Sequence, residues 1–280
     1  MKFEYIKKLG TGYSGSVYLV KNKKKYYSLK IQHILEKDIY DKKSDLWNEI
    51  KFFTYVTDFT PLFKKFYSYN IINNCDFIKN NKSIGLTINN NHIGEYKKLQ
   101  KSNYCVEYIT SYEEDTLGTI IDTLSMKQIY SLILQISYGI MILQKKKYTH
   151  NDFNANNITF TKTKKKYLTI NINNFQCKIP IFSYIYTIID YGDVKHPSSI
   201  NNMKKKKLYL KNYKKIDICN LIDNIENYWF SSNKKKYIIE IKNDIKFMKY
   251  NSDNIKKIIN YYQNKIKYLK RLRLRALDVL

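Results

Sequence analysis

Residues 10–17 read Gly-Thr-Gly-Tyr-Ser-Gly-Ser-Val, which is G-x-G-x-x-G-x-V without a mismatch. Glycines at this spacing let the backbone approach phosphate groups, because no Cβ obstructs the N–H donors. The same letters occur in dinucleotide folds, where the last glycine opens a helix. Here apolar and polar residues alternate on both sides of the cluster, from Phe3 to Val20. The segment therefore predicts a strand, a turn and a second strand.

A lysine in an apolar strand follows the glycine cluster. Lys30 lies in the short segment Tyr26–Gln32, where an unpaired ammonium group is costly to bury. Apolar residues recur at helical spacing over residues 38–56, and Glu49 lies in the middle of that predicted helix. The pattern favours an ion pair between Lys30 and Glu49, although a surface ion pair also explains the glutamate.

The most specific motif follows a long amphipathic helix with Ser125 as its predicted N-cap. Residues 150–158 read His-Asn-Asp-Phe-Asn-Ala-Asn-Asn-Ile and contain H-x-D-x-x-x-x-N. Farther along, an apolar run ends in Asp190-Tyr191-Gly192, which fits D-F-G with tyrosine in place of phenylalanine. Strands with one helix come first and helices come later, which predicts an α+β fold with two lobes.

These motifs, in this order and on these element types, resemble the protein kinase superfamily along nearly all of the chain. Within it, the His-Asn-Asp opening and the long stretch from Asn157 to Asp190 resemble serine/threonine kinases of nucleocytoplasmic large DNA viruses. The resemblance implies one kinase domain over residues 1–280. Its expected parts are a mostly β N-lobe with one helix, a hinge and a mostly helical C-lobe, at about residues 1–106, 107–113 and 114–280.

The resemblance also implies ATP and Mg²⁺ as cofactors and a role for each motif residue. Asp152 would orient the substrate hydroxyl and accept its proton, while Lys30, held by Glu49, would contact the α- and β-phosphates. Asn157 and Asp190 would bind the metal. The residues expected at ATP are Gly10, Thr11, Gly12, Tyr13, Ser14, Gly15, Val17, Lys30, Glu107, Tyr108 and Glu113.

Three of the implied positions lie outside the catalytic motifs. The run Val106–Ile109 looks like the hinge whose backbone pairs with adenine, with Val106 as gatekeeper, and Glu113 falls at the position of a ribose-contacting acid. Asp217, in a helix predicted from Ile216 onward, resembles the aspartate that anchors the catalytic loop.

Departures from the family pattern leave other functions open. Asn154 stands where serine/threonine kinases usually have a lysine, and no Ala-Pro-Glu follows Asp190. Choline- and aminoglycoside-type kinases also use H-x-D-x-x-x-x-N, but they generally lack a complete G-x-G-x-x-G-x-V. A pseudokinase that acts as a binding module usually lacks one of three residues that are all present here, namely Lys30, Asp152 and Asp190.

The net charge of +26 is compatible with a polyanionic partner, because 50 Lys and Arg oppose 24 Asp and Glu. Arginine, however, occurs only at positions 271, 273 and 275, while Lys, Asn, Ile and Tyr are abundant. This is the pattern of adenine- and thymine-rich codons, so we expect no specific nucleic-acid partner. The resemblance to protein kinases implies a protein substrate.

The cysteines and the hydropathy bear on the compartment. Cys75, Cys105, Cys177 and Cys219 lie far apart, without zinc-finger or C-x-x-C spacing, which predicts reduced thiols in a cytosol-like compartment. No run of about 18 apolar residues occurs, so no membrane contact is expected. The interpretation is a soluble intracellular monomer, in the host cytoplasm or the virion if the protein is viral.

Two segments of the second half carry further expectations. Residues 167–172 and 177–181 are predicted to pair as a hairpin around Asn173-Asn174, outside the active cleft. The segment after Asp190 is short and rich in lysine, and Asn151 replaces the arginine with which many kinases bind a phosphorylated activation loop. The sequence therefore predicts an enzyme that needs no phosphorylation there.

Overall fold

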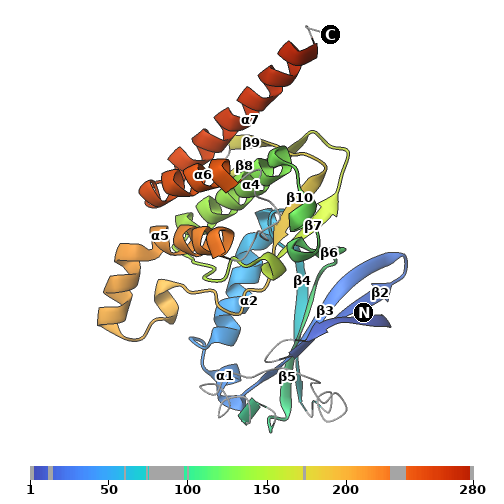
Figure 1. Cartoon of the computed structure of the whole chain (residues 1–280). Helices are drawn as coiled ribbons and strands as arrows, with labels where there is room; N and C mark the ends of the chain where they lie inside the picture. The colour runs from blue at the N-terminus through green and yellow to red at the C-terminus, as the bar shows by residue number, and fades with distance from the viewer. Residues whose placement is uncertain are drawn as a thin grey trace. The chain divides into compact units, whose positions relative to one another are not determined.

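The computed structural model describes residues 3–11, 15–59, 61–73, 75, 98–99, 101–172, 175–227 and 238–277 (Figure 1). The chain forms two compact units. Met1–Asp58 and Lys64–Glu113 make up the N-terminal unit, and Phe59–Phe63 and Glu114–Leu280 make up the C-terminal unit. The tip of the glycine cluster, residues 12–14, lies outside the described residues, as do Asn173-Asn174 and residues 228–237.

The N-terminal unit is built on an antiparallel sheet with the strand order β1-β2-β3-β5-β4. Its strands are β1 (Glu4–Thr11), β2 (Gly15–Asn22), β3 (Lys25–Ile34), β4 (Phe66–Asn73) and β5 (Tyr104–Ser111). Gly15 must be a glycine because a Cβ there would lie 2.0 Å from the carbonyl oxygen of Ile31 on β3. The close approach of β2 and β3 therefore requires this residue of the motif.

The expected helix over residues 38–56 is two helices, α1 (Glu36–Tyr40) and α2 (Asp45–Val56). The break has a local cause, since the carboxylate of Asp41 accepts a hydrogen bond of 2.9 Å from the backbone N–H of Lys43. Such a side-chain turn competes with the helical hydrogen bonds. The second helix buries Leu46, Ile50, Phe52, Phe53 and Val56.

The prediction of a hinge at Val106–Ile109 is wrong. These residues lie inside β5, which pairs with β3 on one side and β4 on the other. The ladder already uses their backbone groups, so the segment cannot offer a free edge to adenine. The change of unit falls later, between Glu113 and Glu114.

The C-terminal unit is mostly helical, with two small sheets. Helix α4 (Met126–Lys145) buries most of its residues, and Figure 1 shows α7 running beside it. The other helices are α5 (Met203–Asn227), α6 (Ile238–Tyr250) and α7 (Ile255–Leu277). One sheet has the order β10-β7-β6, made of β10 (Tyr184–Ile188), β7 (Ile158–Lys162) and β6 (Asp115–Thr116). The other contains β8 (Tyr167–Ile172) and β9 (Phe175–Pro180).

Helix α4 is the core of its unit. It begins after Ser125, whose backbone N–H donates to Oε1 of Gln128 at 2.8 Å, as a helix N-terminus requires. By length and composition α4 could span a membrane, but 78% of that stretch is buried among the other elements of the unit. Gly139 permits the packing of β10, because a Cβ there would lie 2.5 Å from Cδ1 of Ile188.

The predicted hairpin is present, with β8 and β9 paired along their whole lengths. It buries Leu168, Ile170 and Ile179. At its base, the carbonyl oxygen of Pro180 accepts a hydrogen bond of 3.0 Å from the hydroxyl of Ser131 on α4. Helix α5 begins at Met203, well before the expected Ile216. The side chain of Asn202 caps it by accepting a hydrogen bond of 3.0 Å from the backbone N–H of Lys205.

The expectation of four reduced thiols is also wrong. Cys75 and Cys105 form a disulfide across 30 residues of sequence, with their Cα atoms 5.7 Å apart. The backbone N–H of Cys75 donates to the carbonyl oxygen of Asn103 at 2.9 Å, which holds Cys75 beside the start of β5. Cys177 and Cys219 are free.

Candidate active site

The loop between α4 and β7 carries the H-x-D-x-x-x-x-N motif and is fixed from α5. The carboxylate of Asp217 accepts hydrogen bonds from the backbone N–H groups of His150, at 2.9 and 3.0 Å, and Asn151, at 2.8 Å. One turn later on the helix, Oδ1 of Asn220 accepts from the backbone N–H of Phe153. Asp217 and Asn220 lie three residues apart and therefore share a helix face. Two side chains of one helix thus set the path of the loop.

Asp217 is only 1% exposed. Burial raises the pKa of its carboxyl group to about 7, while the hydrogen bonds from Asn151 and His150 act in the opposite direction. Because Asp217 is buried, no water could replace its carboxylate as the acceptor for the backbone N–H groups of His150 and Asn151.

The carboxylate of Asp152 lies between two asparagine amides. Nδ2 of Asn154 donates to its Oδ1 at 2.8 Å, and Nδ2 of Asn157 donates to its Oδ2 at 2.6 Å. Asn154 also caps the short helix of residues 155–157, since its Oδ1 accepts from the backbone N–H groups of Asn156 and Asn157. The residue that departs from the kinase pattern therefore orients the predicted catalytic aspartate.

His150 is a packing residue. Its ring is fully buried, stacks on Phe153 at a centroid distance of 4.7 Å and meets the edge of Tyr191. Nε2 lies 3.0 Å from the carbonyl oxygen of Ile189. Burial lowers the pKa of His150, so the neutral ring is favoured.

The D-Y-G segment lies against this loop. The backbone N–H of Ile189 donates to the carbonyl oxygen of Asn157 at 2.9 Å, which ties the residue before Asp190 to the end of the motif. Tyr191 is buried, and its hydroxyl donates to the carbonyl oxygen of Ile188 at 2.7 Å. Asp190 is exposed and has a φ of 60°, and Asn151 has a φ of 68°. Such strained conformations of non-glycine residues often occur at functional sites.

The segment after Asp190 is ordered by neutral contacts. Asn151 donates from Nδ2 to the carbonyl oxygen of Asp193 at 2.7 Å. Thr149 and Lys195 exchange two backbone hydrogen bonds of 3.0 Å, and the hydroxyl oxygen of Tyr209 lies 2.6 Å from the carbonyl oxygen of Lys147 and 3.0 Å from that of Lys195. Burial raises the pKa of Tyr209 above its ordinary value, so this donor stays protonated.

In the N-terminal unit, the predicted pair is present. Nζ of Lys30 lies 3.3 Å from Oε1 of Glu49, whose side chain is only 5% exposed. The hydroxyl of Tyr108 donates to Oε2 of Glu49 at 3.2 Å. Burial, followed by the charge of Glu49, raises the pKa of Tyr108 well above its ordinary value. Tyr108 is therefore a positioning residue for Glu49, which corrects its assignment to the hinge.

Two other expected ATP contacts are engaged elsewhere in the N-terminal unit. Glu107 lies inside β5, where burial raises the pKa of its carboxyl group. The two oxygens of Glu113 face different partners, because Ser111 donates to Oε1 at 2.6 Å and Nζ of Lys64 lies 3.3 Å from Oε2. A ribose would have to compete with both. Gly10, Thr11, Gly15 and Val17 lie on the two arms of the β1–β2 hairpin.

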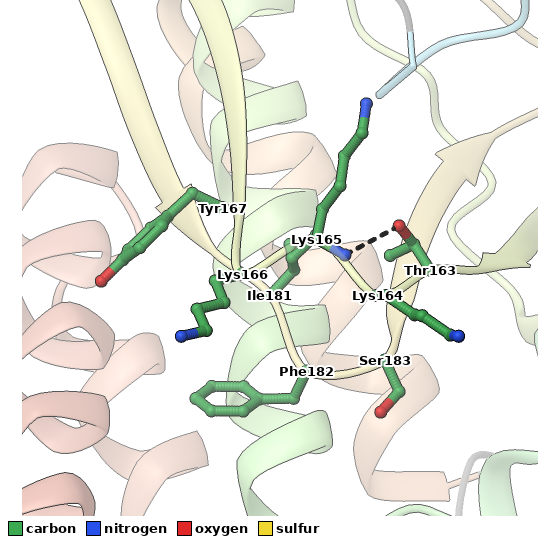
Figure 2. Close-up of a pocket in the computed structure, with 8 residues that line it drawn as sticks. All are labelled: Thr163, Lys164, Lys165, Lys166, Tyr167, Ile181, Phe182 and Ser183. Carbon is green, nitrogen blue, oxygen red and sulfur yellow. Dashed lines mark hydrogen bonds between the residues drawn. The ribbon is translucent and has the colours of Figure 1, made fainter.

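A pocket of about 450 Å³ lies at the base of the β8–β9 hairpin (Figure 2). Lys164, Lys165 and Lys166 line it together with Thr163, Tyr167, Ile181, Phe182 and Ser183. Figure 2 shows the three lysine side chains pointing in different directions, while the backbone N–H of Lys165 donates to the hydroxyl of Thr163. None of the predicted site residues lines this pocket, and its cations do not converge on one point.

Comparison with known proteins agrees with this geometry. Residues 3–195 match the family model described as protein tyrosine and serine/threonine kinase. The chain therefore belongs to the protein kinase family, and its fold is the α+β kinase fold. The family match favours a protein kinase over a small-molecule kinase.

A solved crystal structure of the kinase domain of PF14_0431 is similar to the chain at 16% identity and a TM-score of 0.47. The similarity covers 79% of this chain and 63% of that one. No curated protein matches the sequence.

Two residues that hold the site, Asn220 and Tyr209, were not predicted from the sequence, and Tyr108 was predicted with a different role. Asn220 could have been found from its spacing, because it lies one turn after Asp217. Tyr108 lies 59 residues after Glu49, in β5, and Tyr209 contacts Lys195 from another element. No pattern of neighbouring residues in the sequence indicates either contact.

Proposed function

We propose that this protein transfers the γ-phosphoryl group of ATP to a serine or threonine hydroxyl of another protein, with Mg²⁺ as the metal. The observation that carries the proposal is the setting of Asp152. Its carboxylate is held by Asn154 and Asn157 on a loop that Asp217 anchors. A carboxylate oriented by two amide donors is suited to position a hydroxyl and to take its proton.

The residues in the C-terminal unit fit a magnesium site. Mg²⁺ prefers hard oxygen ligands. The amide nitrogen of Asn157 is used on Asp152, so its amide oxygen would be the ligand, together with the exposed carboxylate of Asp190. Bound Mg²⁺ neutralises charge that develops on the phosphates. In the N-terminal unit, Glu49 and Tyr108 hold Lys30 as the cation that would contact the α- and β-phosphates.

The specificity for serine and threonine rests on the resemblance to viral serine/threonine kinases. A viral origin, a soluble intracellular location and a monomeric state belong to the same proposal. A test uses radiolabelled ATP and Mg²⁺ with casein, histone or choline, followed by phosphoamino-acid analysis. Label on serine or threonine supports the proposal. Phosphotyrosine would contradict the specificity, label on choline alone would indicate a small-molecule kinase, and nucleotide binding without transfer would indicate a pseudokinase.

We expect the β8–β9 hairpin to be dispensable for nucleotide binding. Replacement of residues 164–175 by a short Gly-Ser linker removes β8 and exposes the partners of Leu168 and Ile170. Loss of their burial should cost about 1.5–3 kcal/mol each and lower the melting temperature. ATP affinity, measured well below that temperature, should stay within a few-fold of the wild type. A collapse of ATP binding in the folded variant would mean that the hairpin belongs to the site.

We also expect the enzyme to be active without phosphorylation of Ser198 or Ser199. Asn151, Thr149 and Tyr209 order this segment through neutral hydrogen bonds, so no phosphate is needed to recruit it. Phosphatase treatment and the double variant Ser198→Ala/Ser199→Ala should each leave initial rates on an exogenous substrate nearly unchanged. Ser199→Ala removes a hydrogen bond to the carbonyl oxygen of His196, so its melting temperature is the control for folding. A drop of about tenfold or more after both treatments, equal to about 1.4 kcal/mol, would contradict the prediction.

A further inference from the structure

Three metal-ligand side chains meet in the N-terminal unit, away from the kinase motifs. His33 of β3 lies directly opposite Cys105 of β5 in the strand register, and Cys75 is joined to Cys105. The ligand atoms of all three residues lie within 4.8 Å of one another. Side chains alternate between the faces of a strand, so His33 and Lys30 lie on opposite faces of the sheet. The cluster is therefore separate from the Lys30–Glu49 pair.

The burial of His33 needs an explanation that the disulfide does not give. Its side chain is only 3% exposed, and neither ring nitrogen has a hydrogen bond of normal geometry. A buried polar group without a partner is costly, and an apolar residue would fill the same space without that cost. Burial lowers the pKa of His33, with the backbone of Ser102 acting in the opposite direction. The ring is thus kept in the neutral form that binds metals.

The two cysteines beside His33 can supply sulfur ligands once their disulfide is reduced. Cys105 is fully buried and Cys75 half-buried, beside the apolar cluster of Tyr18, Val20 and Ile31. A dithiol reductant would convert the disulfide into two thiols and itself become a disulfide. The two sulfurs and the imidazole then form a Cys₂His donor set, which is typical of zinc. In tetrahedral zinc sites ligand atoms lie about 3.3–3.8 Å apart, so only small side-chain movements are needed.

We propose that the reduced form of the protein binds one Zn²⁺ through His33, Cys75 and Cys105, with water at the fourth position. Binding replaces two thiol protons by the metal and releases them to solvent. It also gives the buried imidazole a partner. The oxidised form cannot bind in this way, because the disulfide ties up both sulfur ligands. The cluster can therefore bind Zn²⁺ only under reducing conditions, when both sulfur atoms are free thiols.

The test measures metal binding and does not depend on kinase activity. Protein reduced with a dithiol, then freed of reductant under nitrogen, is titrated with Zn²⁺ against a chromogenic chelator, in parallel with oxidised protein. The reduced protein should bind one Zn²⁺ per chain, and the oxidised protein should bind none at that affinity. Titration with Co²⁺ should give thiolate-to-metal charge-transfer absorption only in the reduced protein.

Variants identify the ligands. Cys75→Ser and His33→Phe should each weaken Zn²⁺ binding by well over about tenfold, since even loss of an outer-shell partner costs 10–100-fold. Cys219→Ser, which changes an exposed cysteine, should bind like the wild type. Because Cys75 is only half-buried, its variant keeps the test open if His33→Phe fails to fold. Equal binding by reduced wild type and Cys75→Ser, or by the reduced and oxidised proteins, would overturn the proposal.

Discussion

Asp190→Asn and Lys30→Met are each expected to reduce phosphoryl transfer by at least about 10²-fold, because each removes a charge that stabilises the transition state by about 3–4 kcal/mol. Asp190 is exposed beside Gly192, so its loss should not disturb the core. Lys30 contacts Glu49 and Tyr108 through its ammonium group. Asp152→Asn should behave similarly, because it removes the proposed proton acceptor. Initial rates with radiolabelled ATP and a protein substrate provide the measurement.

Matched controls separate chemistry from folding. Asp253→Asn and Lys24→Met make the same changes at exposed turn residues and should retain wild-type rates. All variants should keep the circular dichroism spectrum and the melting temperature of the wild type to within a few degrees. Near-native activity in a folded Asp190→Asn or Lys30→Met variant would refute the proposed function.

Asp217→Ala is expected to destabilise the C-terminal unit and to lower activity together. The change removes the acceptor of the backbone N–H groups of His150 and Asn151. Each buried donor without a partner costs about 1–3 kcal/mol, so the total for the two donors should be about 2–6 kcal/mol. That is a large share of the 5–15 kcal/mol that stabilises a typical domain. The displaced loop would also carry Asp152 away from its place between Asn154 and Asn157.

Thermal unfolding and initial rates test this prediction. Asp217→Asn keeps one acceptor oxygen and should fall between the wild type and Asp217→Ala in both measurements. Asp223→Ala, at an exposed position of the same helix, is the control for helix propensity and should change neither. A melting temperature and rate of Asp217→Ala equal to those of the wild type would mean that the loop is held by Asn220 and packing alone.

Local patterns predicted the elements that carry the site. Alternation around Gly10–Gly15 predicted a β hairpin, and helical spacing with a capping serine predicted α4. The pair of Lys30 and Glu49 was found because a lysine in an apolar strand needs a partner. These signals are local, because the period of the apolar residues follows from the geometry of the element that they form.

The hinge illustrates a different case. Val106–Ile109 reads Val-Glu-Tyr-Ile, a mostly apolar sequence that predicts a strand equally well in the middle of a sheet and at its boundary. Only the pairing of β5 with strands on both sides distinguishes the two. The role of Tyr108 on Glu49 depends on the same pairing.

By itself, then, the sequence determined the order of strands and helices, the kinase motifs and the residue types that can perform phosphoryl transfer. The tertiary structure alone decided the contacts between distant groups that no motif marks. It placed Asn220 beside the loop of Asp152, Tyr108 on Glu49, and Cys75 beside Cys105 and His33. The physical reason is that these contacts join segments far apart in the chain, and their geometry depends on strand register and helix packing, which no local pattern of residues encodes.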